Sequence, residues 1–333
     1  MDAKAPPKPA PRNGRLPNGK PATKRAPRPF EPHLGPGADP YGHLDAIAPR
    51  FAGVRGLSNT IAQRIGTFAN KSGTGAWPNL PRADIAARLT DLAANPVLID
   101  QHRLNACGPA AAMFLHARRN TSDFVDMVIS LYDTGAGTFG SLSIKGHSLP
   151  QKDPAAFSGG WPGHLLLDWM VLSSLRRSED ETSGATFEFD GTPDEQISGI
   201  TGSGDMVKWL TKGVGYGSAK DETNYLTNKG LSHLRGLAPD AKTNPVLLIN
   251  VSSIQSGAKK APKISKSAGG IFDKLQGKGQ SFFPNHWVVL KKPVPDNATP
   301  VNVWTWGTVR DFDPISKTDW DEAYFGAVIA KMS

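Results

Sequence analysis

The feature that most constrains the fold is the order of two kinds of apolar pattern along the chain. Patterns with helical spacing come first. In PRADIAARLTDLAAN (81–95), Pro81 is placed for a first turn, and Ile85, Leu89 and Leu92 fall on one face. Further helices are expected at 107–119, 122–132, 168–180 and 203–210, with Ser122 and Ser203 as N-caps of the second and fourth of these.

Short runs rich in β-branched and aromatic residues follow, bounded by Pro, Gly and Asn, and this pattern indicates strands. These runs are PVLLINVSS (245–253), HWVVL (286–290), VNVWTWG (301–307) and FGAVIAKM (325–332). Because helices precede strands instead of alternating with them, the sequence predicts an α+β domain and not a series of βαβ units.

A Pro-rich basic segment precedes these patterns. Eleven of the 28 prolines lie in the first 40 residues, and residues 1–28 carry eight Lys or Arg against one Asp, which accounts for most of the formal net charge of +8. We therefore expect a disordered tail over 1–45 and a folded domain over 46–333, with a mobile Lys/Gly/Ser-rich excursion at 256–280. Since the folded part is almost neutral, nucleic acid is not an expected partner.

The N-terminus has charge but no apolar h-region, and no stretch of the sequence is long and apolar enough to span a bilayer. We expect synthesis in the cytoplasm without a Sec signal peptide and no membrane span. Cys107 is the only cysteine, so the fold cannot depend on an internal disulfide.

Cys107 lies where a polar stretch changes into the apolar run CGPAAAMFLHARR (107–119). The free N–H groups and the dipole of a helix N-terminus can stabilise a thiolate, which is the nucleophilic form of cysteine. Gly108 leaves the approach to the sulfur open, and Pro109 suits the first turn of a helix. The alternative is that Cys107 is an inert, buried apolar side chain.

Two distant polar residues can complete a catalytic site around Cys107. Gln101 precedes it by six residues, and its amide can join the Cys107 N–H in binding an oxyanion. His286 opens the strand 286–290, where its imidazole can face a cleft. The strand 301–307 is close enough in sequence to form a hairpin with it, so a polar residue there can orient the ring.

If that hairpin is symmetric about residues 295 and 296, Thr305 lies directly opposite His286. A slip of one residue would move every side chain to the other face of the sheet, so Asn302 and Asp311 remain alternatives. We favour Thr305 as the residue that orients the ring.

The combination Gln–x5–Cys–Gly–Pro at a helix start, then Asn–His–Trp–Val–Val–Leu (285–290), then a strand ending in Trp–Gly, resembles the papain-like cysteine hydrolases, including the bacteriocin-processing C39-like peptidases. The segments 95–111, 168–180 and 324–332 are also similar to papain-like domains of secreted bacterial toxins and effectors. The resemblance covers about residues 80–333. It departs at the third catalytic position, where papain-like enzymes have Asn or Asp and C39-like enzymes have Asp–Pro.

This resemblance implies a papain-like α+β fold, in which a helical subdomain carrying the nucleophile packs on an antiparallel β-sheet carrying the histidine. It implies that Cys107 is the nucleophile, His286 the general base and acid, and Gln101 the oxyanion donor. The implied activity is cofactor-free, cysteine-dependent hydrolysis of amide bonds in a protein or peptide, peptidoglycan peptides included.

The resemblance also implies a bacterial effector or toxin that a specialised system exports, with a cognate immunity protein or a secretion carrier as partner. Two alternatives stay open. One is a glutamine deamidase or acyltransferase on the same Cys–His site, and the other is a papain-like binding module without turnover.

Four other patterns could suggest a binding, catalytic or metal site, but each has a simpler structural explanation. GAGTFG (135–140) is expected to be a turn-rich loop, because it follows a helix and not a strand. Asp311 and Asp313 in RDFDP indicate a solvated turn. Trp304 and Trp306 alternate as on one face of a core strand. No metal is expected, because the histidines lack ligands at metal-binding spacing, namely His147, His164 and His233.

Overall fold

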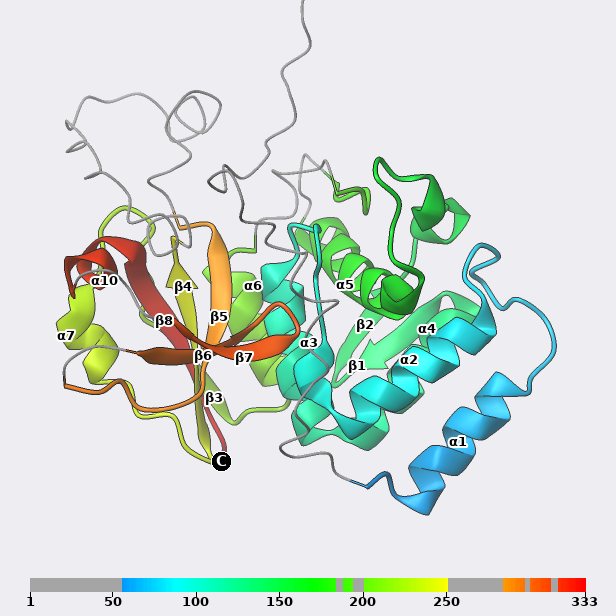
Figure 1. Ribbon diagram of the computed structural model, residues 1–333, viewed down its shortest axis with the longest axis horizontal. Helices are drawn as coiled ribbons and strands as arrows, with labels where there is room; N and C mark the ends of the chain where they lie inside the picture. Colours follow the sequence, from blue (N-terminus) through cyan, green and yellow to red (C-terminus); the bar gives the residue numbers. More distant parts are fainter. Residues whose placement is uncertain (1–55, 184–187, 194–200, 251–283, 297–299, 313–316) are drawn as a thin grey trace, which may run out of the picture. The chain divides into compact units, whose positions relative to one another are not determined.

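Helices dominate the first half of the chain (Figure 1). The computed structural model describes residues 56–183, 188–193, 201–250, 284–296, 300–312 and 317–333. All of these belong to one structural unit. The helices before residue 220 are α1 (Asn59–Ala69), α2 (Arg82–Ala94), α3 (Cys107–Arg119), α4 (Thr121–Thr134), α5 (Leu166–Ser183) and α6 (Ser203–Lys208), which a π-helical turn (Trp209–Gly213) extends.

A six-stranded antiparallel sheet forms the second half, with strand order β3-β8-β4-β5-β6-β7. A separate hairpin of β1 (Ala136–Phe139) and β2 (Leu142–Lys145) follows α4. The strands of the large sheet are β3 (Ser218–Asp221), β4 (Thr243–Ile249), β5 (His286–Leu290), β6 (Val301–Thr305), β7 (Thr308–Phe312) and β8 (Tyr324–Lys331). Helices preceding an antiparallel sheet confirm the predicted α+β class.

The central strands are buried on both faces, which explains their nearly continuous apolar sequences. Because side chains alternate along a strand, Trp287 and Val289 of β5 pack with the helical part of the core, whereas Val288 and Leu290 pack in a second cluster. The second cluster is completed by α7 (Gly230–Arg235) and α10 (Lys317–Ala323), which contribute Leu231, Leu234, Trp320 and Ala323.

Helix α3 lies between the large sheet and the other helices (Figure 1), in contact with β5, α4 and α5. Its residues from Cys107 to Ala117 are all buried, and its small side chains at 110–112 allow close packing. On the sheet side, the ring of Phe114 stacks on Trp304 of β6 with centroids 4.3 Å apart. This packing holds the middle of α3 against the sheet.

A buried ion pair holds the segment that leads into α3. Arg88 of α2 donates from Nε to the Asp168 carboxylate of α5 over 2.8 Å, and both side chains are almost fully buried. The same carboxylate accepts the backbone N–H of Asp100, also at 2.8 Å. Asp168 therefore joins two helices to the residue before Gln101.

The predicted helices at 81–95, 107–119, 122–132 and 168–180 are confirmed, but both predicted N-caps are wrong. Helix α4 begins at Thr121, and the Ser122 hydroxyl instead accepts a hydrogen bond from Arg64. Helix α6 has Gly202 as its N-cap, and the Asp205 carboxylate accepts the Gly202 N–H. Ser203 is thus the first helical residue.

Two segments predicted to be loops contain strands. GAGTFG (135–140) includes β1, whose residues pair with β2, and RDFDP (310–314) includes the end of β7. In both segments the partner strand is only a few residues away in the sequence: β2 follows β1, and β6 precedes β7. A tight hairpin therefore forms although the residues have weak strand propensity. The predicted tail at 1–45 and excursion at 256–280 lie outside the described residues.

Candidate active site

Cys107 is the first residue of α3, and only 5% of its surface is exposed. The backbone N–H of Trp287 acts on its sulfur as a hydrogen-bond donor, together with the N–H groups of Cys107 and Gly108. Trp287 directly follows His286 in β5. The fold thus brings the start of α3 to the start of β5, across 179 positions of sequence.

Burial raises the pKa of the Cys107 thiol to about 11, and the three backbone N–H groups only partly oppose this effect. The expected stabilisation of a thiolate by the helix N-terminus is therefore outweighed by loss of solvent. In this structure Cys107 carries a neutral thiol at neutral pH.

The imidazole of His286 is hydrogen-bonded to Thr305 of β6. Its Nε2 atom lies 2.6 Å from the Thr305 hydroxyl oxygen, and both residues are buried. When Nε2 carries the proton and donates it to this oxygen, Nδ1 is the basic nitrogen of the ring. Thr305 is thus placed to fix the orientation and the tautomer of His286.

The register between β5 and β6 differs from the predicted one by two residues. Val289 pairs with Trp304 and Leu290 with Val303. Continuing this register brings Gly307, and not Thr305, opposite His286. Because a shift of two residues keeps side chains on the same face, Thr305 still reaches the ring as a diagonal neighbour.

The two alternative partners of His286 bind each other instead. Asn302 of β6 pairs with Asp311 of β7, and the Asn302 amide donates to the Asp311 carboxylate over 2.7 Å. Asn302 also lies an odd number of residues from Thr305, so its side chain leaves the opposite face of the strand.

Trp306 covers the His286 ring and is not a core-strand residue as predicted. It occupies a two-residue turn with Gly307 between β6 and β7, and both have positive φ, at 43° and 66°. Positive φ is rare for a bulky residue and is tolerated where the surroundings compensate for its strain. Here the Trp306 ring stacks on His286, with centroids 4.1 Å apart and planes at 14°.

Gln101 is buried beside the loop that leads into α3. Its side-chain Nε2 donates to the Leu104 backbone carbonyl over 3.2 Å, and the backbone carbonyl of Gln101 accepts the Leu104 N–H. An amide NH2 group has two hydrogens. The bond to Leu104 uses one of them and holds the side chain within the turn that precedes Cys107.

Thr201 packs over the start of α3, and no sequence pattern indicated it. A Cβ atom added at Gly108 would collide with the Thr201 side chain, so glycine is required here by close approach. The indole Nε1 of Trp287 donates to the Thr201 carbonyl over 3.1 Å. Trp287 therefore contacts both Cys107 and the residue that covers Gly108.

Burial lowers the pKa of His286 to about 3, and the positive charge of Arg310 adds to this effect. The thiol and the imidazole are consequently both neutral at rest. Such a pair can still act if the proton moves from sulfur to nitrogen as the sulfur attacks, in the manner of a serine–histidine pair.

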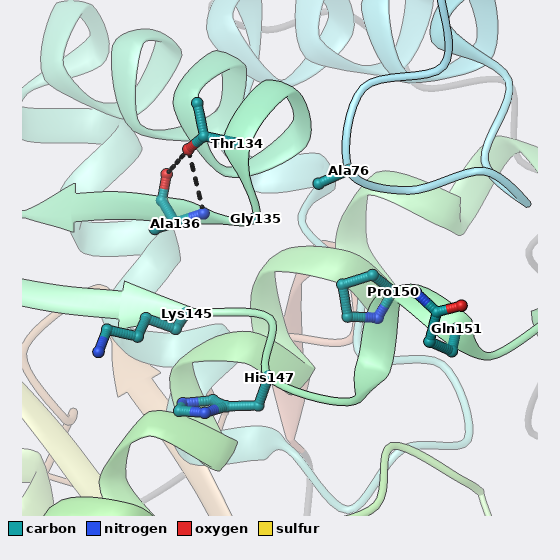
Figure 2. Close-up of a pocket in the computed structure, with 8 residues that line it drawn as sticks. All are labelled: Ala76, Thr134, Gly135, Ala136, Lys145, His147, Pro150 and Gln151. Atoms are coloured by element: carbon teal, nitrogen blue, oxygen red, sulfur yellow. Dashed lines mark hydrogen bonds between the residues drawn. The ribbon is translucent and has the colours of Figure 1, made fainter.

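A separate cavity of about 410 Å³ lies elsewhere in the helical part (Figure 2). Thr134, Lys145 and His147 are among its lining residues, and none of the four predicted site residues is. Within the described residues, no cluster of His, Cys, Asp and Glu could hold a metal ion, and no helix is both long and apolar enough to cross a membrane.

No family model, curated protein or solved structure matches the chain. The chemistry of the site is accordingly inferred from its own residues.

Proposed function

We propose that the protein is a papain-like, cysteine-dependent hydrolase of amide bonds. One observation carries the proposal: the Nε2 atom of the His286 ring lies 2.6 Å from the Thr305 hydroxyl oxygen, while the backbone N–H of Trp287, the residue after His286, acts to lower the pKa of the Cys107 thiol. A nucleophile, a base and a residue that orients the base are the three parts that such catalysis needs.

In the proposed reaction, His286 Nδ1 takes the Cys107 proton as the sulfur attacks the carbonyl carbon of the amide. The backbone N–H of Cys107 and the Gln101 amide stabilise the oxyanion. His286 then gives the proton to the leaving amine, and an acyl-enzyme remains. Water attacks this thioester, with His286 again as base, and releases the acid and the free thiol.

Peptidase or amidase activity is the first choice, on a protein or peptide that includes peptidoglycan peptides. With a glutamine side chain as substrate the same steps give deamidation, and with another amine or a hydroxyl as acceptor they give acyl transfer. We also propose an exported bacterial effector or toxin, with an immunity protein or carrier as partner. That part depends on the sequence resemblance alone.

A papain-like binding module without turnover is the second candidate. It is favoured by the almost complete burial of Cys107 and by the pKa of about 11 that burial gives its thiol. Such a thiol is a poor nucleophile at neutral pH unless a base takes its proton.

Iodoacetamide labelling of the full chain, followed by mass spectrometry, separates the two. In an enzyme, neutral His286 takes the proton of the Cys107 thiol, so Cys107 should be labelled rapidly at pH 7. His286→Ala should abolish this rapid labelling. A binding module should label slowly, with a rate that keeps rising up to the thiol pKa near 11. Cys107→Ala is the control, because it removes the only thiol.

Masses of candidate substrates then distinguish the reactions. Two fragments indicate hydrolysis of a peptide bond, an intact product with a carboxylate in place of an amide indicates deamidation, and an adduct indicates acyl transfer. Labelling that is slow at pH 7 and insensitive to His286→Ala would refute the enzyme proposal.

A further inference from the structure

The side chain of Thr201 covers the beginning of α3 and carries a buried hydroxyl group. Only 2% of the residue is exposed. Within the described residues, the hydroxyl oxygen has no hydrogen-bond partner. A buried hydroxyl that has lost water and gained no partner destabilises the folded state and is rare in native proteins. A ligand that supplies the missing partner would explain why this position carries a hydroxyl group.

The Thr201 hydroxyl lies at the N-terminal end of α3. Outside the helix, its Oγ1 is the atom nearest to the position that a Cβ atom would occupy at Gly108. Because Cα–Cβ bonds of a helix tilt towards its N-terminus, that position lies towards the free N–H groups of the first turn. Pro109 has no N–H, so these groups belong to Cys107 and Gly108. The hydroxyl is therefore placed beside the N–H groups that begin α3.

Strand β5 holds Thr201 in place relative to the thiol. The indole Nε1 of Trp287 donates to the Thr201 carbonyl over 3.1 Å, and the backbone N–H of the same Trp287 acts on the Cys107 thiol. Cys107, His286 and Thr201 are each at most 5% exposed. A substrate that reaches the sulfur therefore has to open the packing over all three groups, and it meets the hydroxyl as it meets the thiol.

The Thr201 hydroxyl does not act on the sulfur itself. The groups that oppose the raised pKa of the Cys107 thiol are the backbone N–H groups of Trp287, Gly108 and Cys107, and Thr201 is not among them. In the part of the chain that the structure describes, the sulfur is not a hydrogen-bond partner of Thr201 Oγ1 either. The partner that fits is a negative charge that forms only after the sulfur has attacked.

We propose that the Thr201 hydroxyl donates to the oxyanion, beside the Cys107 N–H and the Gln101 amide. As the sulfur attacks an acyl carbon, the electron pair of the C=O double bond moves to its oxygen. Thr201 donates a hydrogen bond to this oxygen and keeps its proton, and the bond weakens when C=O forms again and the leaving group departs. The inference deepens the proposed function and rests on it, since only attack on a carbonyl gives an oxyanion.

Two reagents that react with the same thiol separate an oxyanion donor from a structural residue. Iodoacetamide alkylates the sulfur by displacing iodide and forms no oxyanion. The ester p-nitrophenyl acetate acetylates the sulfur through a tetrahedral oxyanion and releases p-nitrophenolate. Mass spectrometry of the full chain at pH 7 gives both rates for Cys107, and Cys107→Ala gives the background acetylation of other residues. The ratio of the acetylation rate to the alkylation rate reports the oxyanion.

Thr201→Val keeps the shape of the side chain over Gly108 and removes the hydroxyl. We expect the ratio to fall by about tenfold to a hundredfold, while the iodoacetamide rate stays within about twofold of the wild type. Thr201→Ser should keep the ratio, because it keeps the hydroxyl. The matched control is Thr211→Val, whose hydroxyl already donates to the Val207 carbonyl over 2.8 Å, and it should leave the ratio as in the wild type.

Stability provides a second measurement. Because the Thr201 hydroxyl has no described partner in the folded protein, Thr201→Val should leave the midpoint of urea denaturation unchanged or raise it. Thr201→Ser loses a buried methyl group and should have a lower midpoint. A midpoint of Thr201→Val below that of Thr201→Ser would show that the hydroxyl is bonded in the resting protein, and would overturn the proposal.

The two proposals fail in different ways. Slow iodoacetamide labelling that is insensitive to His286→Ala would refute the enzyme proposal. The ratio is measured in that case too, and its fall in Thr201→Val would leave the oxyanion donor in place. Equal ratios in Thr201→Val and wild type would overturn the role of Thr201, whether labelling is fast or slow. A parallel loss of both rates gives such an equal ratio and would indicate an effect on the thiol alone.

Discussion

The Nε2 atom of His286 lies 2.6 Å from the hydroxyl oxygen of Thr305, and the two residues come from neighbouring strands of one sheet. A hydroxyl orients the ring as a carboxamide or carboxylate would, but it adds no negative charge. Thr305 therefore does not offset the burial and the Arg310 charge, both of which oppose formation of the imidazolium during reaction. This makes the hydroxyl and its surroundings the first targets for mutation.

Replacement of Thr305 by Val keeps the shape of the side chain and removes the bond to His286. We expect the rate of Cys107 labelling at pH 7 to fall by up to about a hundredfold, because a misplaced base transfers the proton poorly. Thr305→Ser should retain most of the rate. Thr308→Val is the matched control, because Thr308 pairs with Thr305 across the turn. Within the described residues, the hydroxyl of Thr308 donates only to the Val309 carbonyl and not to His286. Equal rates for Thr305→Val and wild type would exclude Thr305 from the site.

Gly108→Ala should destabilise the protein, because the new methyl group collides with the Thr201 side chain. Overpacking of this kind costs about 1–3 kcal/mol in the free energy of unfolding, which urea denaturation measures. Adding Thr201→Gly removes the colliding atoms and should restore part of the loss. By contrast, Gly204→Ala in α6 meets no atom within 4 Å and should be neutral or slightly stabilising. A loss of stability as large at Gly204 as at Gly108 would contradict the role given to Thr201.

Asp168→Asn should lower the free energy of unfolding by about 3–5 kcal/mol, because it leaves the Arg88 charge buried without its partner. The matched control is Asp126→Asn, which breaks the exposed ion pair with Arg64 and should cost less than about 1 kcal/mol. The free energies of unfolding of the two variants are compared by urea denaturation at pH 7. Equal losses would show that the buried Arg88–Asp168 ion pair matters no more for stability than the exposed one.

Acid should destabilise the fold through His116. This residue is fully buried in α3 against the rings of Phe124 and Phe139, and within the described residues neither ring nitrogen has a hydrogen-bond partner. Burial lowers its pKa from 6.5 to about 4. Between these values the unfolded chain binds a proton that the folded chain does not, so stability falls as the pH drops from 6.5 towards 4.

The integrated loss from His116 is about 3 kcal/mol. His116→Leu should make the free energy of unfolding less dependent on pH over this range, with part of the dependence left because burial also lowers the pKa of His286. His164→Gln, at an exposed histidine, should change the dependence far less than His116→Leu, because it removes only the smallest of the causes that lower the pKa of His102, after burial and Arg103. Identical slopes for His116→Leu and wild type in urea denaturation from pH 7 to pH 4.5 would disprove this assignment.

The sequence predicted the parts of the fold that depend on local periodicity. Helix α3 and strand β5 have the predicted bounds, because the apolar runs that form them are wholly buried and end at polar residues. The polar strand β3 (SAKD) was missed, since it pairs with β8 through its backbone and buries little. Likewise, the residues of β7 point partly to solvent and their sequence indicates a turn.

The site was predicted less completely than the fold. The contact of Thr305 with His286 was predicted although the register was wrong by two residues, because only the parity of the shift decides the face of a strand. Nothing in the sequence indicated Thr201, whose contacts are made by tertiary packing. The neutral state of Cys107 was also missed, since helix position favours the thiolate and only the fold reveals how far burial opposes it.

Strand β8 is inserted between β3 and β4, although it follows both of them by many residues. Until residues 324–331 have been synthesised and have paired, β4 has an open edge where the middle of the sheet will be. Early in biosynthesis the apolar strand around Leu247 is therefore exposed and can pair with the wrong chain. Assembly of the sheet must wait for this late segment, so wrong pairing at the β4 edge competes with completion of the sheet until the segment arrives.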